Sequence, residues 1–129
     1  MAHLKLLIWV AAGGAIGASA RYAVGSLATH LTGGHFPWGT FTVNTVGSFI
    51  LGVIAGLMAY AWSPSNEIRS LIIVGGLGAF TTFSSFSLDA VLLMERGRLE
   101  VAAGYILGTF VFSVGGLFVG LRLMRLILT

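Results

Sequence analysis

Phenylalanine rings and hydroxyl groups alternate in GAFTTFSSFS, an uncharged stretch at residues 78–87. Phe80, Phe83 and Phe86 lie three residues apart, so a helix would place them in one stripe. The hydroxyl side chains between and beside them are Thr81, Thr82, Ser84, Ser85 and Ser87. A ring edge is electropositive and a hydroxyl donates hydrogen bonds, so this surface could hold a small anion without a fixed positive charge. Core packing, which explains most aromatic stripes, is the alternative.

Two further groups of polar side chains lie in strongly apolar surroundings. Asn44, within WGTFTVNTVGS, offers two donor hydrogens and one acceptor oxygen. Inside a membrane such a group is often functional, and hydrogen bonding between helices is an equal alternative. Tyr105, Thr109 and Ser113 follow one another at steps of four, which aligns three hydroxyls along one helix face.

Three glycines precede the aromatic stretch, at Gly75, Gly76 and Gly78. Each weakens a helix by roughly 1 kcal/mol relative to alanine, so we expect the helix to unwind there. Unwound backbone within a membrane must be buried in protein or face water. The freed carbonyls could be satisfied by neighbouring hydroxyls. Alternatively, a pair from each of two subunits could bind a hard cation such as Na⁺ or Ca²⁺.

The remaining residues exclude several classes of protein. The four acidic residues lie late in the third apolar segment or beside linkers: Glu67, Asp89, Glu95 and Glu100. A proton-coupled exporter would be expected to hold a central carboxylate, so that class is disfavoured. There is no cysteine, no catalytic triad, no metal-ligand cluster and no phosphate loop, which argues against an enzyme. Seven scattered lysines and arginines do not form a nucleic-acid surface.

The elements that must position these residues are membrane spans. Of the 129 residues, 57% are hydrophobic and 9% charged, whereas a soluble domain carries about 25% charged residues. We predict an all-α membrane protein in which residues 1–129 form one four-helix transmembrane domain. The four apolar segments cover about residues 4–31, 38–62, 68–94 and 101–127. We interpret the first as an uncleaved span and not as a signal peptide, because its apolar character continues past Ala20.

Assembly follows from size and charge. Glycine pairs recur at a spacing of four, and helix packing within one subunit is the simplest reason for any single pair. Four helices enclose little space, so a water-lined route predicts at least a homodimer. One side of the membrane would carry Lys5, Arg69, Arg122 and Arg125, and the other Arg96, Arg98 and, if it faces that way, Arg21. This weak bias would allow both orientations, and hence an antiparallel dimer.

Taken together, these stretches resemble the Fluc (CrcB-type) family of small fluoride channels. The resemblance covers the whole length through GGAIGASARY, WGTFTVNTVGS, GGLGAFTTFSSFS and GYILGTFVFS. The third of these, with the upstream WGT and VN, is the most specific. Small multidrug transporters share the size and the dual orientation, but they lack this signature and carry an acidic residue in the first span.

The resemblance implies an antiparallel, dual-topology homodimer with two fluoride pathways in a bacterial inner membrane. By position in the motifs, the pathway residues would be Asn44, Phe83, Phe86, Tyr105, Thr109 and Ser113. Arg21 matches an arginine near the pore entrance, where it would raise the local anion concentration. The backbone carbonyls of Gly78 and Thr81 would hold a structural Na⁺ at the dimer centre, which is not transported.

The implied role is passive export of cytoplasmic fluoride, which lowers its toxicity. The chain departs mildly from the family where Ala79 replaces a frequent glycine, Asp89 a glutamate and Thr109 a serine; these changes bear on rates more than on function. Two alternatives differ in class: a small coupled multidrug-type exporter, and a structural membrane subunit whose hydroxyls and rings only pack.

Overall fold

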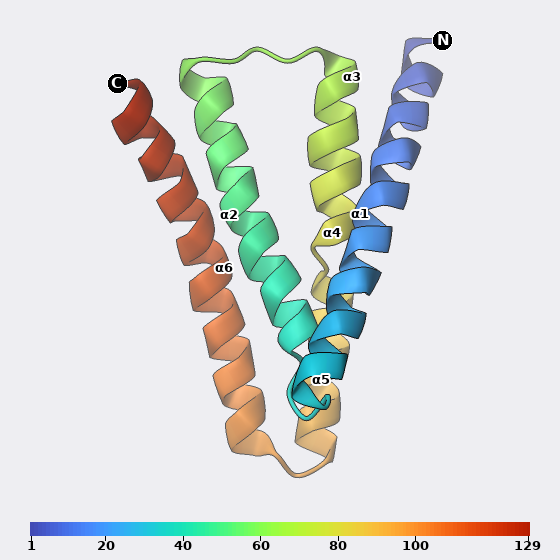
Figure 1. Cartoon of the computed structure of the whole chain (residues 1–129), viewed down its shortest axis with the longest axis vertical. Coiled ribbons are helices and arrows are strands. Elements are labelled where there is room, and N and C mark those ends of the chain that lie inside the picture. Colours follow the sequence, from blue (N-terminus) through green and yellow to red (C-terminus); the bar gives the residue numbers. More distant parts are fainter.

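The computed structural model describes all 129 residues and contains only helices, turns and loops. Four helical segments are long and apolar enough to cross a membrane, which confirms the predicted fold class. They are α1 (Ala2–Thr32), α2 (Trp38–Tyr60), a composite third span (Asn66–Glu95) and α6 (Leu99–Leu128). Both termini and the α2–α3 connection lie at one end of the molecule, and the other two connections lie at the opposite end (Figure 1).

The third span is interrupted near its middle, as predicted. It consists of α3 (Asn66–Arg69), the wide π-helical turn η1 (Ser70–Leu77), α4 (Gly78–Phe80) and α5 (Phe83–Glu95). Between α4 and α5, the backbone of Thr81 and Thr82 is extended, with φ and ψ of −84° and 155°, and −153° and 120°.

The position of this break corrects the sequence-based expectation. We expected unwinding at Gly75–Gly78, but these glycines are helical, and Gly78 itself has φ −60° and ψ −36°. Gly75 and Gly76 instead allow close packing of the third span on α1. A Cβ on Gly75 would collide with the Val10 carbonyl oxygen, and one on Gly17 would collide with the Gly76 carbonyl oxygen. Their helix-weakening effect is therefore outweighed by contacts that no larger residue permits.

Glycines also bring α2 and α6 together. A Cβ on Gly52 would strike the Leu117 carbonyl oxygen, and one on Gly120 would lie 2.5 Å from the Phe49 carbonyl oxygen. Packing within one subunit therefore explains these spaced glycines. The pair Gly104 and Gly108 is different, because Gly104 meets no atom within 4 Å and Gly108 only a ring edge at 3.9 Å.

The buried core is small and lies between α5 and α6. Its buried members are Ala90, Leu93, Ala102 and Tyr105, and rings from the first linker, α2 and α5 pack around them. Only 14 of the 129 residues are buried, so most apolar side chains face outward, as a lipid-embedded protein requires. At the end bearing this core, Arg98 donates a 2.7 Å hydrogen bond to the His35 carbonyl and ties the two linkers together.

Candidate functional site

The side-chain amide of Asn44 makes two hydrogen bonds with the backbone at the break in the third span. Its Nδ2 donates to the Thr82 carbonyl at 3.0 Å, and the Thr82 N–H donates to its Oδ1 at 2.7 Å. The side chain is 9% exposed, so a lost partner would leave a buried polar group unsatisfied. The amide on α2 thus pairs with both backbone groups of Thr82, the N-cap residue of α5.

Two other side chains add hydrogen bonds at the break. The Thr82 hydroxyl accepts from the Ser85 N–H at 3.1 Å and so caps the N-terminus of α5. Arg21, on α1, donates from Nε to the Ala79 carbonyl at 2.9 Å. Groups from α1, α2 and α5 therefore meet at one short segment of extended backbone.

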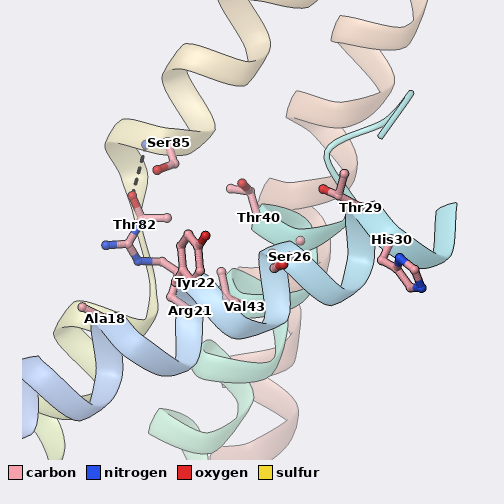
Figure 2. A pocket seen from close by; sticks show the side chains of 12 residues that line it. Ala18, Arg21, Tyr22, Ser26, Thr29, His30, Thr40, Val43, Thr82 and Ser85 are labelled. Carbon is pink, nitrogen blue, oxygen red and sulfur yellow. Dashed lines mark hydrogen bonds between the residues drawn. The ribbon is translucent and has the colours of Figure 1, made fainter. Parts of the chain in front are cut away.

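One cavity, of about 830 Å³, lies between α1, α2 and the break, and we name it the first cavity. Its twelve lining residues include Arg21, Tyr22, Ser26, Thr40, Thr82 and Ser85 (Figure 2). Only three of the twelve are hydrophobic, and none is acidic. The guanidinium of Arg21 therefore gives this space a positive potential that attracts anions.

The second cavity, of about 570 Å³, lies between α2, the break, α5 and α6. It brings together five of the six predicted pathway residues, Asn44, Phe83, Phe86, Thr109 and Ser113. No charged residue lines it. Thr82 lines both cavities, so it forms a wall between the two spaces at the break.

Two hydroxyls in the second cavity have no hydrogen-bond partner within the chain. Thr109 Oγ1 and Ser113 Oγ are buried and unpaired. Because a buried hydroxyl without a partner costs roughly 1–3 kcal/mol, these two donors are suited to a ligand that can accept from them. The predicted row of three hydroxyls is divided, since the Tyr105 hydroxyl donates to Asp89 Oδ2 at 3.1 Å and Tyr105 does not line the cavity.

The phenylalanine stripe is also divided. Phe83 and Phe86 lie in the second cavity with ring centroids 5.6 Å apart, and Phe86 packs on Tyr105 at 5.2 Å. Phe80 instead lines an apolar groove formed with α1, α2 and η1. The extended residues between Phe80 and Phe83 rotate the chain out of helical register, so the three rings do not share one face.

Sequence reasoning named the Thr82 hydroxyl and Tyr105 as parts of a polar surface, but it did not predict that Thr82 caps α5 or that Tyr105 pairs with Asp89. The sequence does contain a signal for this cap. Threonine is a favoured N-cap residue, because its hydroxyl accepts from a backbone N–H two or three residues later. The Asp89–Tyr105 hydrogen bond joins α5 to α6 across the third linker, and no local pattern indicates it.

The two carbonyls predicted to bind Na⁺ belong to Gly78, the first residue of α4, and to Thr81, the residue that follows α4. No group of three or more histidine, cysteine or acidic side chains is placed to hold a metal ion. A cation at the break would therefore rely on backbone oxygens, which are the ligand type that Na⁺ accepts.

Comparison with known proteins shows similarity to one family along nearly the whole chain. Residues 8–121 match the family model described as CrcB-like protein, Camphor Resistance (CrcB). A protein of Rhodospirillum centenum named Fluoride-specific ion channel FluC is 54% identical over 122 residues, 95% of this chain and 97% of the relative. A protein of the same name from Agrobacterium fabrum is 53% identical over 90% of this chain and 93% of its own length. One from Nitrobacter winogradskyi is 46% identical, with 94% and 96% covered.

Proposed function

This chain belongs to the CrcB family, and we propose that it conducts fluoride passively out of the cytoplasm as an antiparallel homodimer. It is a multi-pass membrane channel and not an enzyme. Membership of the family and the names of the relatives support fluoride as the permeant ion. The second cavity supplies the chemistry, because it offers unpaired hydroxyl donors and phenyl edges without any fixed charge.

The geometry supports permeation better than tight binding. A fixed cation in the narrow part of the route would hold fluoride too strongly for release, whereas neutral dipoles can replace water and let the ion leave. The only charged side chain at the break, Arg21, lies in the more polar first cavity. Fluoride attracted there would lose water in stages as it passes Thr82 into the second cavity.

Export needs no coupled energy source in this proposal. Fluoride enters a cell as the neutral weak acid and dissociates in the less acidic cytoplasm. The trapped anion is then driven outward by the negative interior, with about 2.3 kcal/mol per charge for each 100 mV. A coupled exporter is disfavoured because no acidic residue lines either cavity.

A second copy of the chain would complete the pathway. Phe83 lines the second cavity yet is 79% exposed in the single chain, so a second copy packed on this face would enclose the cavity. Gly78 also has free space beside it in the single chain. A Cβ there would meet nothing closer than the Ile73 carbonyl oxygen at 3.6 Å. Gly78→Leu should therefore fit the isolated chain, and loss of the dimer on size exclusion would place the partner against this residue. An unchanged dimer would contradict that arrangement.

Na⁺ would be held by the Gly78 and Thr81 carbonyls, where its charge would link the broken spans of two subunits. Replacing Na⁺ with a large organic cation on both sides should silence the channel slowly, as bound ions escape. Loss of a driving gradient would instead stop flux at once. Flux that persists indefinitely without small cations would remove Na⁺ from the proposal.

The direct test is fluoride efflux from liposomes that contain the purified protein. We expect a fluoride current that follows the membrane potential and is unaffected by collapse of a proton gradient. Chloride-loaded liposomes serve as the control for a nonspecific leak. Efflux that requires a proton gradient would favour the coupled exporter, and no efflux from correctly dimeric protein would favour a structural subunit.

Antiparallel assembly has its own test, made simple by the absence of cysteine. Glu100→Cys places one thiol beside the third linker and alters only a negative charge, which contributes little to orientation. We expect a membrane-impermeant reagent to label it from both sides of the membrane. Labelling from one side alone would contradict dual topology.

A further inference from the structure

The hydrogen bonds around the break determine which carbonyls keep their helical donors. In a continuous α-helix each carbonyl accepts from the N–H four residues later. The Thr82 N–H, which would serve the Gly78 carbonyl, donates instead to Asn44 Oδ1 at 2.7 Å. The Ser85 N–H, which would serve the Thr81 carbonyl, donates instead to the Thr82 hydroxyl at 3.1 Å. The two carbonyls assigned to Na⁺ are thus ones whose helical donors are engaged elsewhere.

Neighbouring carbonyls receive donors from other groups. The Ala79 carbonyl accepts from Arg21 Nε at 2.9 Å, and the Thr82 carbonyl accepts from Asn44 Nδ2 at 3.0 Å. The Leu77 carbonyl accepts both the backbone N–H and the hydroxyl of the residue four positions later, at 3.0 Å and 2.9 Å. Each of these three oxygens is less available to a cation, because a bound donor occupies one of its lone pairs.

We propose that Asn44, Thr82 and Arg21 select the cation-binding oxygens of the break by controlling where backbone donors go. The inference rests on the Na⁺ site of the proposed function. Asn44 draws away the donor of the Gly78 carbonyl, and the Thr82 hydroxyl draws away the donor of the Thr81 carbonyl. Arg21 occupies the carbonyl of Ala79, one of the two that lie between them.

Asn44 thereby becomes a positioning residue for the cation as well as a wall of the second cavity. If its acceptor oxygen is removed, the Thr82 N–H can return to the Gly78 carbonyl and compete with the ion. A typical protein hydrogen bond then weakens apparent cation binding by up to about tenfold. The anion pathway and the cation site are linked through this one side chain, so they should respond differently to two substitutions of it.

The experiment measures cation binding by thermal stability and not by flux. Purified dimer in detergent is melted while Na⁺ is titrated against N-methylglucamine at constant ionic strength. A ligand that binds only the native state stabilises it by RT ln(1 + [L]/Kd). The midpoint of the titration is defined as the Na⁺ concentration that gives a stabilisation of RT ln 2, which equals Kd. The shift caused by Na⁺ is compared within each variant, which removes any general loss of stability.

The first matched pair changes only what Asn44 can accept. Asn44→Ala removes the acceptor for the Thr82 N–H, and its Na⁺ midpoint should rise about tenfold. Asn44→Asp keeps that acceptor, so its midpoint should stay at or below the parent value, even though we expect it to lose fluoride flux. A role for Asn44 in the anion pathway alone would leave both midpoints unchanged.

The second matched pair changes the Thr82 hydroxyl. Thr82→Ala releases the Ser85 N–H toward the Thr81 carbonyl, and its midpoint should also rise, whereas Thr82→Ser keeps the hydroxyl and should match the parent. Ser113→Ala lies in the second cavity away from the break, and it should leave the midpoint unaltered.

Parent-like midpoints in both Asn44→Ala and Thr82→Ala would overturn the inference and leave the Na⁺ site standing. If Asn44→Ala does not fold, the Thr82 pair decides alone. A parent protein with no Na⁺-dependent stabilisation would remove the cation from the proposed function, and this inference with it.

Discussion

The first and second cavities share Thr82 as a wall but differ in the way that each can attract an anion. The first is polar, and the positive charge of Arg21 lies on its wall. The second has no charged wall, and it offers two phenyl rings with the unpaired hydroxyls of Thr109 and Ser113. One space therefore gathers anions by long-range charge, and the other replaces their water by short-range neutral contacts.

This difference separates concentration of the ion from its recognition. A charge acts over several ångströms, is screened by salt and attracts all small anions alike. Ring edges and hydroxyls act only at contact, so they respond to the size and hydration of the ion. Changes in the second cavity should consequently have larger effects on flux and selectivity than changes in the first.

The largest effect is expected from introducing a charge into the second cavity. Asn44→Asp would place a carboxylate about 4 Å from a passing anion, a repulsion of about 4 kcal/mol at an effective dielectric of 20 and roughly 1,000-fold in flux. Liposome efflux should be abolished while the protein still elutes as a dimer. Near-normal efflux would show that Asn44 does not face the pathway.

Removing the unpaired hydroxyls should have the next largest effect. Each hydrogen bond to an ion contributes about 1.5–3 kcal/mol, so Thr109→Val with Ser113→Ala removes at least about 3 kcal/mol and should lower efflux by at least about 100-fold. Stability should not fall, because neither hydroxyl has a partner within the chain. Thr45→Val is the matched control, since its buried hydroxyl is also unpaired but lines neither cavity. Equal fluxes in the two variants would make the hydroxyls irrelevant to conduction.

Replacing a phenyl ring should lower the fluoride flux somewhat less. Phe83→Ile keeps apolar bulk but removes the electropositive edge, and a loss of up to about tenfold is expected from the size of aromatic edge interactions. Phe86→Ile should reduce flux similarly but also lower stability, because Phe86 packs on Tyr105 and the core. Melting temperature and efflux measured together separate the two effects. If flux is preserved in both variants, the rings serve only in packing and not in conduction.

The smallest effect should come from the first cavity. Arg21→Gln removes the charge but keeps a donor that can reach toward the Ala79 carbonyl. Efflux should fall several-fold at low ionic strength, and the deficit should shrink at about 0.15 M salt, where the screening length is about 8 Å. A deficit that does not change with salt would mean that Arg21 acts through its hydrogen bond and not through its charge.

Much of this protein could be predicted from its sequence because the relevant signals are local. Apolar runs longer than 20 residues require spans, and the structure has four of them at the expected positions. Glycines spaced by four predict close packing, and those of α1 and α2 pack within the chain, whereas Gly104 and Gly108 of α6 make no close contact. Residue type alone also identified most of the second cavity, because amides, hydroxyls and rings are unusual together in an apolar span.

The tertiary structure decided where the third span breaks and which polar groups remain unpaired. Local propensity placed the break at the glycines, but all three are helical, and Gly75 and Gly76 pack against α1. The break lies at Thr81 and Thr82, where Asn44, 38 residues earlier in the chain, pairs with the Thr82 backbone. That pairing moves Phe80 away from the other two rings. Hydrogen bonds between distant segments carry no periodic signal, so only the assembled helices could determine these outcomes.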